Sequence, residues 1–475
     1  MTIVIFGNLI KLIMGYVTGI VLPLSLSYDS YGYYKLFGLY LLYVGVFHFG
    51  FIDGIFLKYA GIDYNDLNKK NFSKYFRFLL ILQITMTLLV CLASIIFLDG
   101  DRRLVFVLVS LNVMPWNLLT YFQMISQITS RFKEYSLRNI LYSILSMIFM
   151  ITLVLIGDKN YLHYIIVQIV VNIILVIYYL FTYKDITMHK SKVDKTSIVS
   201  YQESMAESDK TSIRSIFKLG IPLLLSNLVV VLIVNLPKQV VDIAFSVKDF
   251  AIFAFAFSLL SFITLFINAM STVLYPSLMR SSESRRDDLY TPLSNGLSML
   301  SIAALMGYFV LKIIVINYIP KYEDSIETLL FLFPSVMIIS QIQIIKQNYF
   351  KSKLNNKEFM WITLFFTIIS IVIYTFIVVF SMGNLELITI IYVFILYVWD
   401  CFCGRFLEKK YTLKYLRSNV ANLVGIITFY LVSTMFETIV AMIIFGITII
   451  IIYLIFFREE LKIIYNKILS IMTKK

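Results

Sequence analysis

Long apolar runs follow one another along almost the whole chain, and they constrain the fold more than any other feature. Ile443–Phe457, for example, contains no charged residue. A helix needs about 20 mostly apolar residues to cross a bilayer, whereas barrel strands are shorter and alternate between apolar and polar side chains. The 475 residues are 60% hydrophobic and 15% charged, whereas soluble domains are about 45–50% apolar and about 25% charged. The sequence therefore predicts an all-α, polytopic membrane protein.

About fourteen segments are apolar and long enough to span the bilayer, with ends placed to within roughly 2–4 residues. The expected spans are 3–26, 35–57, 76–98, 103–127, 137–157, 161–183, 214–236, 250–275, 293–319, 326–350, 358–382, 385–407, 418–436 and 438–457.

Lys and Arg residues concentrate in the loops after the even-numbered spans, for example Lys69, Lys70 and Lys74 after the second. Loops after the odd-numbered spans are short and mixed or acidic. Because basic loops stay on the cytoplasmic side, this alternation predicts that both termini lie in the cytoplasm. The formal net charge of +13 has the same explanation, so we expect no nucleic-acid partner.

The two halves of the chain resemble each other, which predicts an internal duplication. The same spacing separates Asn8 from Asn227 and Pro115 from Pro334. A six-span unit repeated in one orientation predicts two pseudo-symmetric bundles around a central cavity, as in transporters built from parallel repeats. The expected parts are a first bundle at 1–183, a cytoplasmic linker at 184–213, a second bundle at 214–410, and an added helix pair with a basic tail at 411–475.

Ionisable side chains inside the spans are energetically expensive, so each is a candidate for function unless a partner explains it. Cations that face one cavity favour an anionic ligand such as a diphosphate. The expected substrate-binding cations are Lys11, Lys58, Lys238, Lys346 and Arg405, and the expected ion-coupling residues are Asp53, His48 and Asp400.

Each of these residues also has a structural explanation. The side chains of Lys58, Lys346 and Arg405 are near enough to span ends to reach the interface. Asp53 is close in sequence to Lys58, and Asp400 to Arg405, so each acid has a pairing partner on its own helix. Lys238 fits an outer loop, and His48 fits a packing role. Lys11 is the hardest to explain in this way, because it follows eight or nine residues of the first span.

The amino-acid sequence around the second span resembles that of a known family. It runs from Tyr31-Gly-Tyr-Tyr-Lys35 to Gly50-Phe-Ile-Asp53-Gly54-Ile-Phe-Leu-Lys58-Tyr-Ala-Gly61. The eighth span, which ends in Leu274-Tyr275-Pro276, is similar to the same family. These stretches resemble the polysaccharide repeat-unit flippases of the multidrug/oligosaccharidyl-lipid/polysaccharide (MOP) exporter superfamily.

The resemblance implies two six-helix bundles around a cationic cavity, and undecaprenyl-diphosphate-linked oligosaccharide as the substrate. The expected setting is a bacterial plasma membrane, with membrane lipids, a polysaccharide polymerase and a chain-length regulator as partners, and with capsule, O-antigen or exopolysaccharide as the alternative products. The energy source stays open between a proton or sodium gradient and consumption of the product by a polymerase. The added C-terminal spans are similar to those of peptidoglycan-precursor flippases, where they form a groove for the lipid tail.

Two other classes of function compete with a flippase. A cation-coupled multidrug antiporter of the same fold would favour acidic residues at membrane depth, whereas the charges here are mostly basic. A membrane glycosyltransferase or polymerase would need a large outer loop, and the longest hydrophilic segment here is predicted to be cytoplasmic. No phosphate-binding glycine-rich loop or zinc motif occurs. We therefore expect a transporter and no enzyme, with neither a cofactor nor a metal.

Overall fold

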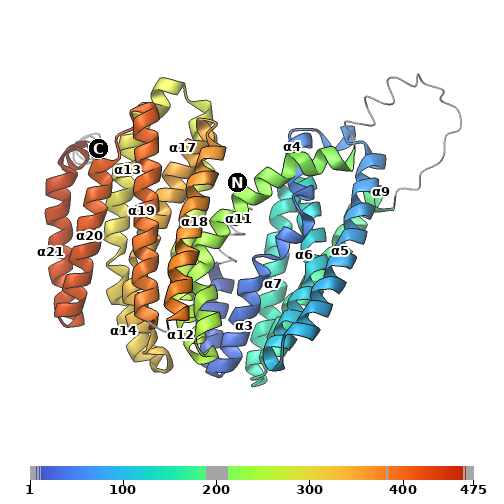
Figure 1. Ribbon diagram of the computed structural model, residues 1–475, viewed down its shortest axis with the longest axis horizontal. Helices are drawn as coiled ribbons and strands as arrows, with labels where there is room; N and C mark the ends of the chain where they lie inside the picture. The colour runs from blue at the N-terminus through green and yellow to red at the C-terminus, as the bar shows by residue number, and fades with distance from the viewer. Residues whose placement is uncertain are drawn as a thin grey trace, which may run out of the picture. The chain divides into compact units, whose positions relative to one another are not determined.

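The structure, a computed structural model, describes residues 12–188, 212–380 and 383–463, together with Gly7, Ile10 and Asn466. All regular secondary structure in these residues is helical (Figure 1), which confirms the all-α prediction. By their packing, the residues form two compact units, Met1–Leu232 and Ile233–Lys475.

The described part of the first unit contains the following helical elements and the beginning of α11. They are η1 (Val17–Val21), α2 (Leu22–Ser25), α3 (Tyr28–Leu41), η2 (Val44–His48), α4 (Phe51–Tyr59), η3 (Tyr64–Asp66), α5 (Lys69–Phe97), α6 (Gly100–Ile128), α7 (Phe132–Leu155), α8 (Tyr161–Thr182), α9 (Lys184–Thr187) and the first part of α11 (Ile213–Ala244).

The second unit begins inside α11 and includes the C-terminal helix pair. Its further elements are α12 (Val247–Arg280), α13 (Glu283–Ala304), α14 (Gly307–Tyr318), η4 (Pro320–Tyr322), α15 (Ser325–Leu332), α16 (Pro334–Ser340), η5 (Gln341–Lys346), α17 (Gln347–Ser352), α18 (Asn356–Val379), α19 (Leu385–Tyr411), α20 (Leu416–Met435) and α21 (Thr438–Phe456).

The boundary between the units falls inside α11, after Leu232. The first part of α11 packs on α4 of the first unit, as described below. The start of the predicted linker forms α9, and 189–211 lie outside the described residues. The predicted bounds 1–183, 184–213, 214–410 and 411–475 describe the sequence repeat and stay a prediction.

Many helices are long and apolar enough to cross a membrane. Among the described residues there are 11, or up to 12 if α3, η2 and α4 are counted as one bent span. The first predicted span corresponds to the shorter apolar helix Leu12–Ser25, and the eighth falls on α12, which is described only in part. The protein is thus a multi-span membrane protein, and the total of fourteen spans stays a prediction.

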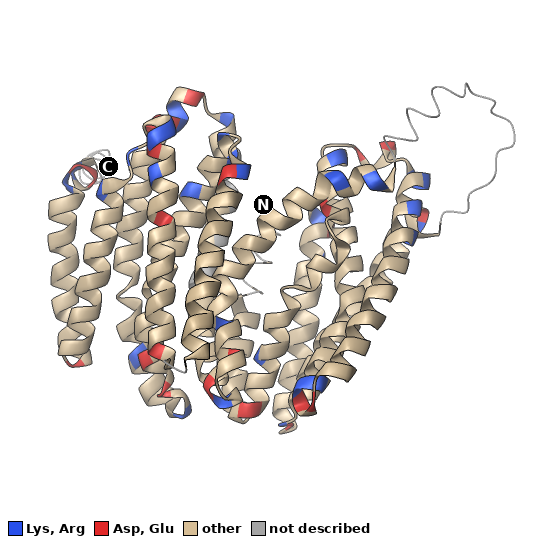
Figure 2. Ribbon diagram, viewed as in Figure 1, with Lys and Arg blue, Asp and Glu red and all other residues tan. Residues whose placement is uncertain are grey.

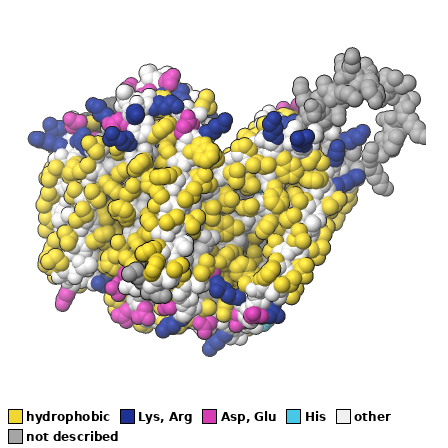
Figure 3. All heavy atoms as spheres, viewed as in Figure 1, with side chains coloured by type: hydrophobic (Ala, Val, Ile, Leu, Met, Phe, Trp, Pro, Cys, Tyr) yellow, Lys and Arg dark blue, Asp and Glu magenta, His cyan; other side chains and the backbone are white. Residues whose placement is uncertain are grey.

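Charge and exposure follow the pattern that a bilayer requires. In each unit, charged residues gather near the two ends of the helices, and the middle of the helices is largely uncharged (Figure 2). Hydrophobic side chains cover most of the surface between these ends on the face that Figure 3 shows. Leu155 and Val379, for example, are 80% and 68% exposed. An apolar surface of this extent is unfavourable in water and is expected where lipid surrounds the helices.

Aromatic rings fill much of the core of the first unit. Phe122 stacks on Tyr179 and Tyr183, with ring centroids 5.8 and 5.6 Å apart. Phe51 of α4 lies 5.9 Å from the Tyr75 ring of α5 and 5.3 Å from the Phe217 ring of α11. Offset and edge-to-face contacts of this kind add about 0.5–1.5 kcal/mol beyond area burial, so Phe51 helps to hold α4 between its two neighbours.

Candidate functional site

The second predicted span, 35–57, is wrong as a single helix. The chain leaves α3, forms the short helix η2, and continues into α4 at an angle of 63°. Phe49 and Gly50 make this break, with φ angles of 50° and 80°. A left-handed conformation is easy for glycine but costs about 1–2 kcal/mol for a residue such as Phe49, so the break must be stabilised by its surroundings.

Two amides from neighbouring helices provide this stabilisation. Gln83 of α5 donates to the carbonyl of Phe47 at 3.1 Å. Asn117 of α6 donates to the carbonyl of Val44 at 3.1 Å and to Gln83 Oε1 at 2.7 Å. Gln83 and Asn117 are both fully buried. Carbonyls freed by a broken helix in a membrane need such partners, and the sequence analysis did not identify either amide.

His48 and Asp53, two predicted ion-coupling residues, lie on opposite sides of the break and face each other. The backbone N–H of Gly50 donates to His48 Nδ1 at 3.1 Å, while His48 Nε2 lies 3.8 Å from Asp53 Oδ2. The side chains of His48 and Asp53 are only 7% and 14% exposed. Asp53 thus faces His48, and the structure gives no ion pair between Asp53 and Lys58.

The break also allows an unusually close approach between α4 and α11. A Cβ atom on Gly50 would lie 2.6 Å from Gly220 C, and a Cβ on Gly54 would lie 2.8 Å from Ile216 C. Atoms cannot approach so closely, so only glycine fits at these positions. A small residue every fourth position is a common way to bring membrane helices together. Figure 1 shows the start of α11 beside α4.

Lys58 lies in the last turn of α4, whereas Asp53 lies in the first turn. Its Nζ is buried and has no hydrogen-bond partner among the described residues. Its nearest recorded contact is the ring of Tyr59, with Nζ 5.3 Å from the centroid. No carboxylate of the described residues therefore neutralises this ammonium group.

In the second unit, Lys346 and Asp400 form a fully buried ion pair. Lys346 Nζ lies 2.5 Å from Asp400 Oδ2, and the two side chains are 0% and 3% exposed. Asn419 of α20 donates to Asp400 at 3.1 Å and accepts from Lys346 at 3.4 Å. Lys346 therefore does not extend to the interface, and Asp400 pairs with Lys346 and not with Arg405.

The local geometry of η5 positions Lys346 for this pair. Residues Gln341–Lys346 form a π-helix, a rare local widening that often occurs at functional positions. Gln341, at its start, donates to Ser298 at 2.8 Å and to the Ser294 carbonyl at 3.1 Å, both on α13. η5 is thereby fixed to α13, with its last residue facing α19 and α20.

The C-terminal helix pair is bonded to the rest of the second unit by buried polar contacts. Besides Asn419, Ser418 bonds Ser294 at 2.9 Å, and Tyr430 donates to the carbonyl of Phe331 at 2.8 Å. Tyr453 of α21 donates to the carbonyl of Met299. The pair is thus an integral part of this unit.

The remaining predicted cations have different surroundings. Lys238 lies inside α11 and not in a loop. It donates to Asn235 at 3.1 Å, and its Nζ is 4.3 Å from the centre of the Phe257 ring. Arg405 is exposed on α19 and is hydrogen-bonded to Tyr415, a position that suits contact with the interface. Lys11 lies outside the described residues.

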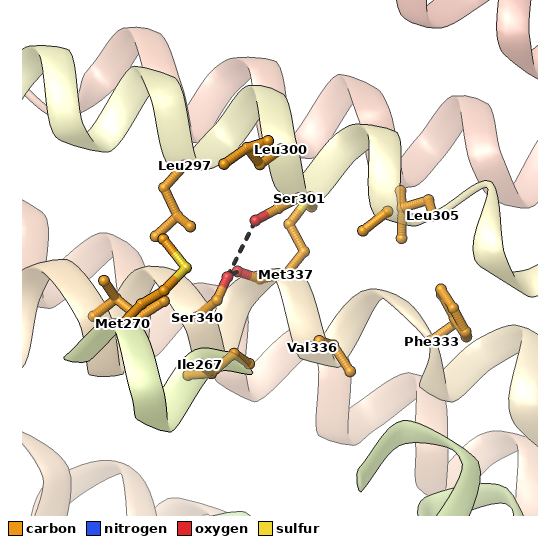
Figure 4. A pocket seen from close by; sticks show the side chains of 12 residues that line it. Ile267, Met270, Leu297, Leu300, Ser301, Leu305, Phe333, Val336, Met337 and Ser340 are labelled. Carbon is orange, nitrogen blue, oxygen red and sulfur yellow. Dashed lines mark hydrogen bonds between the residues drawn. The ribbon is translucent and has the colours of Figure 1, made fainter. Parts of the chain in front are cut away.

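A small apolar cavity of about 120 Å³ lies between α12, α13 and α16 (Figure 4). Met270, Leu300 and Met337 are among its lining residues. The polar ones, Ser301 and Ser340, bond each other at 3.1 Å. Because the two hydroxyls are partnered, the cavity does not suit a charged head group.

Comparisons with known proteins add one decisive finding. No protein-family model and no curated protein sequence matches the chain. Among solved structures, the lipid II flippase MurJ in an inward closed conformation matches 97% of this chain and 99% of its own, with a TM-score of 0.61 at 12% identity. The chain has the fold of the MOP-superfamily transporters.

Two further solved structures have the same fold. One is an outward-facing multidrug resistance MATE transporter, with a TM-score of 0.58 at 12% identity. The other is a MOP transporter from Pyrococcus furiosus, described as having a binding pocket of reverse polarity, with a TM-score of 0.57 at 12% identity. Both matches cover 89% of this chain and 94% of the other. The superfamily fold is thus shown, and the polysaccharide repeat-unit family stays a prediction.

Proposed function

We propose that the protein is a flippase that moves undecaprenyl-diphosphate-linked oligosaccharide repeat units from the inner to the outer leaflet of a bacterial plasma membrane by alternating access. The exported units would serve capsule, O-antigen or exopolysaccharide synthesis, and a polymerase with a chain-length regulator would consume them.

The observation that carries the proposal is the buried ammonium group of Lys58, which has no partner among the described residues. An ionised side chain at membrane depth costs several kcal/mol unless something compensates it. An anion supplied by the substrate would compensate it when bound. In a lipid-linked oligosaccharide, the diphosphate is the group that concentrates negative charge in a small volume.

Lys238 supports the same conclusion in the second unit. Its side chain contacts the neutral amide of Asn235 and the ring of Phe257, and no carboxylate pairs with it in the described part of the chain. Lys58 in the first unit and Lys238 in the second are thus two lysines whose charge no carboxylate of the described residues neutralises. Lys346 differs, because Asp400 already neutralises it.

The competing function is a multidrug antiporter, which would need a carboxylate available to a cationic drug. Asp400 is occupied by Lys346 at 2.5 Å, and Asp53 faces His48 at 3.8 Å. The added helix pair favours a flippase as well: the match to MurJ covers 97% of the chain, whereas the match to the MATE transporter covers 89%.

Replacing Lys58 or Lys238 with methionine is expected to reduce export of lipid-linked oligosaccharide about tenfold or more at equal protein level. Methionine keeps the volume and removes the charge, and hydrogen bonds to charged groups contribute about 1.5–3 kcal/mol, where 1.4 kcal/mol is tenfold. Polysaccharide output from a deletion strain that carries each variant is the measurement. Lys409→Met removes a positive charge from the exposed end of α19 and is the control that should retain export. Normal output from both lysine variants would refute the proposed anion binding.

Gene deletion tests the reaction class itself. Finished repeat units that accumulate on the cytoplasmic leaflet would support a flippase. Truncated units would indicate a glycosyltransferase, and finished units on the outer leaflet would indicate a polymerase. If lipid-linked sugars do not change but drug sensitivity rises, the multidrug antiporter is correct.

A further inference from the structure

The break in the second span is a strained structure held by a small number of contacts. Phe49 is left-handed without being glycine, and such strain persists only where the surroundings impose it. Gln83 and Asn117 bond the carbonyls before the break. On the other side of the break, the backbone N–H of Gly50 donates to the imidazole of His48.

This hydrogen bond fixes the protonation pattern of His48. The N–H of Gly50 donates to Nδ1, so Nδ1 carries a lone pair and the ring proton resides on Nε2. Nε2 faces Asp53 Oδ2 at 3.8 Å, and that oxygen is buried with no hydrogen-bond partner among the residues that the structure describes. The imidazole therefore joins two elements, since it accepts from the backbone of the break and directs its own proton toward a carboxylate in the first turn of α4.

A second proton on the imidazole has to bind at Nδ1, where it replaces the lone pair that accepts from Gly50. The Gly50 N–H then loses its acceptor, and an unsatisfied buried donor costs about 1–3 kcal/mol. The imidazolium is compensated by the Asp53 carboxylate once the two side chains close from 3.8 Å to about 3 Å. Binding of the proton thus favours a changed geometry of the break, and a changed break favours binding of the proton.

We propose that His48 and Asp53 form a proton-binding site whose occupancy switches the geometry of the broken second span. The proton is taken up at Nδ1, the Gly50 hydrogen bond breaks, and the imidazolium pairs with Asp53. No other bond forms or breaks.

The surroundings suit a proton better than a metal ion. Hard cations such as sodium or magnesium take mostly oxygen ligands, whereas this site offers one carboxylate and one ring nitrogen. No cluster of three His, Cys, Asp or Glu side chains occurs in the described part of the chain. The helices that pack here face it with neutral amides: α5 contains no acidic residue, and the only acidic residue of α6 is Asp101 in its first turn. The basic residues of these elements include Lys58 of α4, four on α5, two on α6 and three on α11. They are Lys58, Lys69, Lys70, Lys74, Arg77, Arg102, Arg103, Arg214, Lys218 and Lys238.

The switch has a direct mechanical target within the same unit. Gly50 and Gly54 are the residues that α4 places against Gly220 of α11. A change of backbone conformation at Phe49 and Gly50 alters this contact. The backbones of α4 and α11 already touch there, so α11 has to move in response. If the proposed flippase function is correct, the proton would be its coupling ion, and this contact would transmit proton binding to α11.

The experiment uses the full chain in lipid nanodiscs without substrate. The chain has 3 histidines, so ¹⁵N-histidine labelling gives few signals, and substitution of His163 and His189 assigns them. NMR then follows the His48 Nδ1 resonance as pH falls, while hydrogen exchange measured by mass spectrometry follows the segment 43–54. We expect exchange in this segment to rise at least tenfold, after correction for the intrinsic effect of pH, in step with protonation of His48.

Two variants and a control make the test specific. His48→Gln keeps an oxygen that can accept from Gly50 but cannot be protonated, so the segment should stay protected at every pH. Asp53→Asn removes the carboxylate that stabilises the imidazolium, so the protonated fraction of His48 should fall at least threefold at a given pH. His163→Gln, which affects an exposed histidine bonded to Asp158, should change nothing in this segment.

Three results would overturn the proposal: His48 titrates without a change in exchange, the pH effect persists in His48→Gln, or His48 stays unprotonated throughout the range in which the protein is folded. Because no substrate is present, a negative result leaves the flippase proposal intact. Failure of the transport experiments likewise leaves this test valid.

Discussion

Replacing Lys346 with methionine, or Asp400 with asparagine, is expected to destabilise the second unit by about 3–5 kcal/mol, because either change leaves an unpaired charge in a site that excludes solvent. The two side chains are 0% and 3% exposed. Asn419 is the other recorded partner of the pair, and a neutral amide cannot neutralise either charge. A loss of this size should lower the melting temperature in detergent and reduce the amount of folded protein.

The double variant Lys346→Met, Asp400→Asn should recover most of the lost stability. Replacing both partners of a buried ion pair often leaves the free energy of unfolding unchanged or even raises it. The asparagine still accepts from Asn419, and the methionine fills the lysine volume. Arg103→Met is a suitable control, because Arg103 and Asp99 form an exposed pair, 41% and 95% exposed, and such pairs contribute only about 0–1 kcal/mol.

The same double variant separates structure from transport. If Lys58 and Lys238 bind the anion and the Lys346–Asp400 pair is structural, the double variant should still export oligosaccharide. A stable double variant that has lost export would instead place Lys346 or Asp400 in the transport cycle. Single variants as stable as the wild type would contradict the assignment of a buried, mutually dependent pair.

The sequence predicted the helical class well, because hydrocarbon thickness acts on each segment independently. A run such as Ile443–Phe457 has one stable conformation in a bilayer whatever surrounds it. The partners of the charged residues could not be predicted in the same way. From sequence, Asp400 was assigned a nearby partner on its own helix, Arg405, whereas its partner in the structure, Lys346, comes from η5. Such pairing depends on helix packing, which hydropathy does not encode.

The break in the second span was missed because it contains no proline. Phe49 and Gly50 interrupt the helix only because Gln83 and Asn117, on two other helices, bond the freed carbonyls. The sequence did contain one sign of the break, namely a polar amide inside each of two apolar spans. These amides indicate a broken helix only when they are considered together with Gly50. The two prolines that match in the sequence repeat have different local structures. α6 continues through Pro115, whereas α16 begins at Pro334 and leads directly into the π-helix η5.

Substituting alanine for Gly220 should be the most damaging small change in the first unit. A Cβ at this position would overlap the carbonyl oxygen of Gly50 and the backbone nitrogen of Gly54. Both obstacles are backbone atoms, so no side-chain rotation can relieve the overlap. Overpacking usually costs about 1–3 kcal/mol, and a clash of backbone against backbone belongs at the upper end of that range. We expect a lower melting temperature and, since α4 and α11 must separate, loss of export.

Gly38→Ala is the matched control for this prediction. Gly38 lies within α3, and a Cβ there would have no atom within 4 Å. Alanine is favoured over glycine in a helix by about 1 kcal/mol, so this variant should be as stable as the wild type or more stable. Melting temperature and export measured side by side decide the matter. If both alanine variants behave like the wild type, α4 and α11 cannot be in contact through Gly50, Gly54 and Gly220, and the proposed proton switch would lose its route to α11.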